Sequence, residues 1–146
     1  MKRAGPAVLV LLGKRELRAC ADGLLGDDPD AVAYCVDFVC ADTLGCWHNR
    51  ARAMMCRRLK HIPLPTAQRQ RLVTAILRRL EDGRIDEQFR DQLRLAIGLD
   101  PMACVAAASR VRAQTPTWVR RFGAWLEARA AAVRGAKTMG EEYAID

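Results

Sequence analysis

The chain has 146 residues and a formal net charge of +7, and 51% of its residues are hydrophobic whereas only 5% are aromatic. This length predicts one domain with a substantial core. The absence of Asn-Gly pairs and of alternating β-branched runs excludes a β-rich fold. No apolar stretch approaches the roughly 18 residues of a membrane span. Together these observations predict an all-α protein that does not cross a membrane.

The first predicted helix runs from Pro6 to Leu25 and dominates an N-terminal segment, residues 1–28. Its start is similar to a secretory signal peptide, because two basic residues precede a short apolar run. That run is shorter than usual, and Lys14 follows it before any cleavage site. We therefore expect an intracellular, most simply cytoplasmic, protein. An organellar presequence stays open as an alternative, although the segment contains no Ser.

Six further helices are predicted by apolar residues at helical spacing and by Pro, Asp and Gly at the helix ends. The expected ranges are 29–43, 46–61, 65–82, 85–97, 101–114 and 115–134. With the first helix they make about seven helices in one domain, residues 1–134. From Gly135 onward the chain has no apolar face, so we expect residues 135–146 to form a flexible tail.

Three prolines, Pro29, Pro65 and Pro101, are spaced 36 residues apart, and each opens a predicted helix. This period and layout resemble HEAT and armadillo-type arrays, whose helical hairpins bury their faces by stacking. The resemblance implies a short α-solenoid of three hairpins behind the N-terminal helix. An irregular bundle with evenly spaced prolines is the alternative. The hairpin units would be residues 29–64, 65–100 and 101–136.

Positive charge is concentrated in the middle of the chain. Residues 46–100 carry twelve bases and six acids, and the stretch Cys46–Leu80 alone holds nine Lys or Arg and no acid. By contrast, residues 22–42 hold six Asp and no base. At about 100° per residue, the two helices of the basic stretch each bury one face and expose a basic one. The exposed residues are predicted to form a basic ridge of Arg50, Arg57, Lys60, His61, Arg71 and Arg78.

The ridge predicts two classes of partner, because guanidinium groups suit both carboxylates and phosphates. An acidic protein surface would make the chain an adaptor or a subunit of a larger complex. Nucleic-acid phosphate, above all structured RNA, is the alternative. We favour the protein partner because no RNA-binding motif is present and most aromatic residues are expected to be buried. In a third interpretation the ridge pairs within the chain, with Asp27, Asp28, Asp30, Asp37 and Asp42.

No catalytic residue is predicted. The chain has no G-x-S-x-G motif and no glycine-rich phosphate loop, and its only serine is Ser109. A small enzyme acting on a small-molecule substrate is therefore a less favoured alternative to a non-catalytic binding or assembly module. We expect no cofactor.

Cysteine and histidine offer one candidate metal set, but it lies on a single predicted helix. Side chains at these spacings point in different directions, so we predict no metal site and expect buried cysteines and solvated histidines. The other cysteines mostly lie in apolar helical runs, where a free thiol behaves as a small hydrophobe, and we expect reduced thiols. The four residues considered as metal ligands are Cys46, His48, Cys56 and His61.

Overall fold

The computed structural model describes residue 9 and residues 12–26, 28–113 and 117–143. Within these residues the chain forms seven α-helices and a short 3-10 helix, and no strand. The predicted all-α class is confirmed. None of the helices in the described part is both long enough and apolar enough to cross a membrane. The elements are α2 (Lys14–Asp22), η1 (Gly23–Leu25), α3 (Pro29–Cys40), α4 (Cys46–Leu59), α5 (Thr66–Glu81), α6 (Phe89–Leu99), α7 (Pro101–Arg112) and α8 (Thr117–Tyr143).

The three evenly spaced prolines all lie at helix starts. Pro29 and Pro101 occupy the first turns of α3 and α7, where the missing N–H group costs no hydrogen bond. The aspartate before each one caps the helix. Asp28 accepts from a backbone N–H at 3.0 Å, and Asp100 does so at 3.1 Å. Pro65 takes the N-cap position of α5.

Two predicted helices differ from the structure. The predicted start at Pro6 lies outside the described residues, but the helix is not continuous through Leu12 and Gly13. Helix α2 begins at Lys14, because Gly13 is extended and its N–H donates to the Glu16 carboxylate at 3.1 Å. Helix α6 begins at Phe89 rather than four residues earlier. There the Asp86 side chain accepts from a backbone N–H two residues on, at 2.7 Å, a turn that competes with helix.

The segment predicted to be a flexible tail is helical as far as Tyr143, because α8 continues through it, and its flexibility stays a prediction. Residues 136–142 include Ala, Lys, Met and Glu, which favour helix. Adding them to an existing helix requires no new nucleation. Helix α8 therefore continues through this segment although the segment has no apolar face. The last three residues lie outside the described part of the chain.

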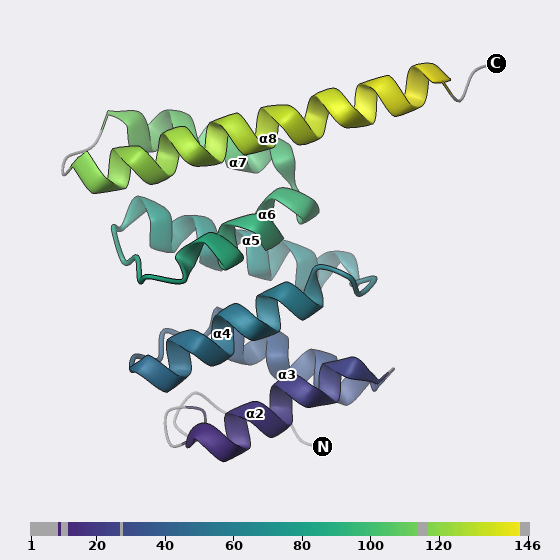
Figure 1. The fold of residues 1–146 in the computed structure, drawn as a ribbon, viewed down its shortest axis with the longest axis vertical. Coiled ribbons are helices and arrows are strands. Elements are labelled where there is room, and N and C mark those ends of the chain that lie inside the picture. Colours follow the sequence, from purple (N-terminus) through teal and green to yellow (C-terminus); the bar gives the residue numbers. More distant parts are fainter. Residues whose placement is uncertain (1–8, 10–11, 27, 114–116, 144–146) are drawn as a thin grey trace.

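The helices lie in two layers (Figure 1). Helices α2, α4, α6 and α8 form one layer, and α3, α5 and α7 form the other. Helices two apart in the chain pack side by side within a layer, as α4 does with α6 and α3 does with α5. Each predicted 36-residue unit thus contributes one helix to each layer. The α-solenoid and the likeness to HEAT and armadillo arrays stay predictions.

The core lies between and within these layers. Its largest fully buried side chains include Phe38 on α3, Met55 on α4, Leu72 on α5 and Phe89 on α6. Helix α8 packs closely on α7 because it presents Gly123, where a Cβ atom would lie only 3.0 Å from a side-chain carbon of Val111. This packing joins the two layers at the α7–α8 end of the stack.

Candidate functional site

The structure places the predicted basic ridge on two layers. Arg57, on α4, donates to Asp91 of α6 at 2.7 Å. Arg71, on α5, donates to Asp37 of α3 at 2.9 Å. Because α4 and α5 lie in opposite layers (Figure 1), each of these arginines pairs with a helix of its own layer.

The other four residues of the predicted ridge are exposed. Arg50 lies on α4, seven residues before Arg57 and on the same side of the helix. Lys60 and His61 follow α4, which ends at Leu59, two residues earlier than predicted. Arg78 lies on α5. The structure therefore brings Arg50 and Arg57 together on one side of α4.

One residue of the ridge pairs within the chain as the third interpretation expected, because Asp37 accepts from Arg71 at 2.9 Å. Asp42 accepts from Arg79 at 3.4 Å, but Arg79 is not part of the predicted ridge. The partners in each pair are more than 30 residues apart in the sequence, so the pairs tie successive helices together. Asp27 lies outside the described residues.

A different basic surface lies on the outer side of the layer formed by α2, α4, α6 and α8. On α4, Trp47, Arg50, Met54 and Arg57 recur every three or four residues, so they lie along one side of the helix. Basic residues of the neighbouring helices extend this surface on both sides. We call it the basic face, and its basic residues are Lys14, Arg18, Arg50, Arg57, Arg90, Arg94 and Arg129.

Trp47 stands in the basic face with 44% of its surface exposed. The Lys14 ammonium lies 4.2 Å from its ring centroid and the Arg50 guanidinium 5.3 Å away, so both make cation–π contacts. The expectation that most aromatic residues are buried does not hold for Trp47. The buried side of α4 instead runs through His48 and Arg52, so the first turn of the helix presents Trp47 to solvent.

A groove of about 120 Å³ separates α2 from α4 beside this tryptophan. Its floor is apolar, and Lys14, Arg18 and Arg50 stand at its edges. No acidic side chain occurs among the described residues that line it. The groove therefore joins an apolar surface to concentrated positive charge. Its remaining lining residues are Leu17, Ala21, Trp47, Ala51 and Met54.

A second aromatic cluster lies at the α6–α8 end of the basic face. The guanidinium groups of Arg90, Arg94 and Arg129 lie 5.8, 5.7 and 5.4 Å from the ring centroid of Trp125. Trp125 itself is half-buried against the core. Both ends of the face thus combine tryptophan with several cations.

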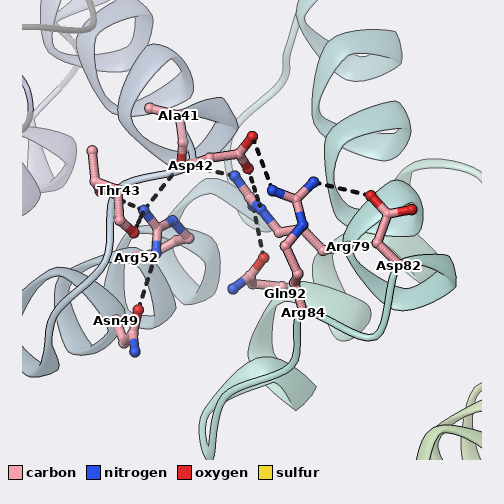
Figure 2. Close-up of polar contacts among 9 residues, drawn as sticks. All are labelled: Ala41, Asp42, Thr43, Asn49, Arg52, Arg79, Asp82, Arg84 and Gln92. Carbon is pink, nitrogen blue, oxygen red and sulfur yellow. Dashed lines mark hydrogen bonds and ion pairs between the residues drawn. The ribbon is translucent and has the colours of Figure 1, made fainter.

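Two other arginines of the basic stretch are buried, contrary to the expectation that its charges are solvated. Arg52 is only 3% exposed and Arg79 only 6%. Both donate to the carbonyl oxygen of Ala41, at 3.1 and 2.9 Å (Figure 2). Ala41 ends α3, so the two guanidinium groups cap the negative end of that helix. Arg52 also donates to Thr43, at 3.0 Å to its carbonyl and 2.7 Å to its hydroxyl.

Arg52 is a buried cation without a carboxylate partner. Burial and, secondly, the nearby charge of Arg79 lower the pKa of Arg52 to about 10, so it stays charged at neutral pH. Its acceptors are neutral, including Asn49 Oδ1 at 3.3 Å, and its guanidinium lies 5.2 Å from the Phe38 ring centroid. No ion pair to it exists within the described part of the chain. Its Nε–H is buried and has no acceptor.

These buried arginines line a cavity of about 410 Å³ where the α3–α4 and α5–α6 loops meet. Gly83 ends α5 at a φ of 72°, and the N–H of Arg84 donates to the carbonyl of Arg79 at 2.9 Å. This turn brings Arg84 beside the buried pair (Figure 2). Asp42 lies between Arg79 and Arg84 at 3.4 Å from each, and Asp82 contacts Arg84 at 3.0 Å.

The helical spacing of the apolar residues could have predicted that Arg52 and Arg79 are buried. Arg79 comes three residues after Ile76 and seven after Leu72, on the buried side of α5. Arg52 likewise comes four residues before the buried Cys56. Charge alone suggested solvent exposure, although helical phase placed both residues inward.

The side chains considered as metal ligands are dispersed. Cys46 and His61 are exposed, whereas Cys56 and His48 are buried, so the expectation of a solvated His48 was wrong. His48 Nε2–H donates to the carbonyl of Leu12 at 2.9 Å, which holds the ring inward. Across the ranges that the structure describes, no three His, Cys, Asp or Glu side chains cluster closely enough to hold a metal ion.

All six cysteines have free thiols, and their surroundings differ. Burial raises the pKa of Cys35, Cys56 and Cys104 to about 12 each. Cys46 is exposed. Because the thiolate is the reactive form, a raised pKa lowers reactivity at a given pH.

We therefore expect a thiol reagent at pH 8 to modify Cys46 quickly in the native protein. Cys35, Cys56 and Cys104 should react only on unfolding, because a pKa near 12 leaves roughly one thiol in ten thousand ionised. Stopped-flow absorbance with Ellman-type reagents measures this directly. Cys46→Ser should remove the fast phase, and a fast phase that survives this substitution would contradict the prediction.

Comparisons with protein family models, with curated proteins and with solved structures find no match to this chain.

Proposed function

We propose that the chain is a non-catalytic binding module whose basic face receives an acidic surface of a partner protein, as an adaptor or a subunit of a larger complex. The groove between α2 and α4 carries this proposal, because it combines an apolar floor with basic edges. Protein interfaces combine an apolar centre with a polar rim, and Trp and Arg often supply most of the binding energy. An acidic, amphipathic segment of a partner would match both properties.

The surroundings of Trp47 favour a protein partner over RNA. Proteins that bind single-stranded nucleic acid stack bases on exposed aromatic rings. Here the Trp47 ring is already in contact with Lys14 and Arg50. In addition, Asp91 neutralises part of the charge of Arg57. The basic face therefore supports recognition of carboxylates beside an apolar anchor better than recognition of successive phosphates.

Replacing Trp47 with alanine should weaken partner binding by about 30-fold, the loss of roughly 2 kcal/mol expected for an interface anchor. The immobilised full chain would be used to capture partners from nuclease-treated extract. The captured protein would then be titrated against wild type and Trp47→Ala by surface plasmon resonance. Circular dichroism would confirm that the variant folds.

Two variants on the opposite layer serve as controls. Met102→Ala removes an exposed apolar side chain from α7, and Arg78→Glu reverses an exposed charge on α5. Neither should change affinity, whereas Arg50→Glu on the basic face should slow association in a salt-dependent way. Binding that is lost on nuclease treatment, or that Trp47→Ala and Arg78→Glu weaken equally, would contradict the proposal. The first of these results would favour the RNA alternative.

A further inference from the structure

The cavity lined by Arg52, Arg79 and Arg84 is separate from the basic face. It lies where the α3–α4 and α5–α6 loops meet, beside the C-terminus of α3. Among the described residues Arg52 has only neutral acceptors, whereas Arg79 donates to the Ala41 carbonyl and to Gln92 and makes a longer contact, 3.4 Å, to the Asp42 carboxylate. A fixed, buried cation that is satisfied by neutral groups retains much of its charge for an incoming anion.

From this arrangement we infer that the cavity binds an oxyanion, the carboxylate or phosphate group of a small molecule. Arg52 lines the cavity, and its Nε–H is buried without an acceptor. Gln92 lines the cavity as well. Its Oε1 accepts from Arg79 at 2.9 Å, so its other amide atom is a donor, and in Figure 2 that nitrogen points away from Arg79.

The Asp42 carboxylate binds Arg79 and Arg84 only loosely, so an additional anion could still bind these arginines. Asp42 contacts Arg79 and Arg84 at 3.4 Å, longer than the 2.7–2.9 Å typical of such charged pairs, and 60% of its side chain is exposed. An oxyanion with better geometry could share these two arginines with Asp42 or displace it toward solvent. Asp82 contacts Arg84 but does not line the cavity.

The charges and shape of the cavity limit the class of ligand. Three arginines and two aspartates, Asp42 and Asp86, line it, which gives a net charge of +1. The Asp86 carboxylate is engaged by a backbone N–H at 2.7 Å. Leu44 and Ile85 form apolar walls, and Leu44 is 87% exposed at the rim. The cavity therefore fits a small organic acid or phosphoester, whose oxyanion would lie toward the arginines and whose apolar part would lie along these walls.

The test is binding of two defined probes, succinate and inorganic phosphate, to the full chain. Isothermal titration calorimetry would be run at constant ionic strength, with chloride as the reference anion. We expect saturable binding of at least one probe in excess of chloride, and a higher melting temperature in its presence. The tighter probe identifies whether the natural oxyanion is a carboxylate or a phosphate.

Arg84→Gln is the deciding variant, because half of this side chain is exposed and its loss should leave the fold intact. It should weaken binding of the probe by about tenfold or more. Arg110→Gln, an exposed arginine on α7 that pairs with Glu81, removes the same charge elsewhere and should change nothing. Trp47→Ala should also bind the probe normally, which separates this site from the basic face.

Two results would overturn the inference. One is the absence of saturable binding of either probe beyond the effect of chloride. The other is equal weakening by Arg84→Gln and Arg110→Gln, which would indicate general charge screening. Arg52→Lys adds a second check where it folds, because it keeps the charge but loses the planar fork and should weaken binding at least as much as Arg84→Gln.

Discussion

Replacing Phe89 with alanine should lower the free energy of unfolding by about 4 kcal/mol. Phe89 is fully buried at the start of α6, and its ring meets Phe122 of α8 edge-on with the centroids 6.0 Å apart. Its side chain thus joins the second predicted hairpin to the third. Because a typical domain is stable by only 5–15 kcal/mol, this loss would remove a large share of the total. Urea unfolding followed by circular dichroism measures it.

Two matched substitutions separate burial from side-chain size. Phe89→Leu keeps most of the apolar volume and should cost less than about 1.5 kcal/mol. Met102→Ala also shortens a large apolar side chain, but Met102 is 58% exposed on α7, so stability should hardly change. A cost for Phe89→Ala as small as that for Met102→Ala would show that the α6–α8 contact does not hold the two hairpins together.

Replacing Arg79 with methionine should destabilise the protein by about 2–3 kcal/mol. The change removes a desolvated charge and its repulsion of Arg52, which is favourable. It also removes the donor to Gln92 Oε1 and one donor to the Ala41 carbonyl, and Gln92 is only 2% exposed. We expect the lost hydrogen bonds to dominate, because a buried acceptor left unpaired has no water to replace its partner.

A double-mutant cycle tests this reason directly. Gln92→Leu in the Arg79→Met background removes the orphaned acceptor and should recover part of the lost stability. Arg78→Met, an exposed neighbour on the same helix, is the control and should change stability by less than about 0.5 kcal/mol. If the double variant were less stable than Arg79→Met alone, the cost would have to come from packing instead.

The surface proposed to bind a partner could be predicted from the sequence only in part. Arg50 and Arg57 were placed correctly on one exposed side of α4, because helical phase determines which residues share a face. Arg71 and Arg78 were joined to them because the two helices are adjacent in the chain. The contribution of Lys14, Trp47 and Arg94 depends on α2 and α6 packing beside α4, and a single-helix pattern does not contain that information.

By itself the sequence determined the all-α class and the proline-marked starts of α3 and α7, because helices depend on local hydrogen bonds and on capping residues beside them. Helical phase placed Arg52 and Arg79 on the inward sides of their helices, but only the tertiary structure decided which groups they contact and that they line a cavity. Arg79 reaches the carbonyl of Ala41, 38 residues earlier in the chain, across the stack of helices. Burying a guanidinium group is favourable only where such distant acceptors are already in place, so packing decides which arginines face water.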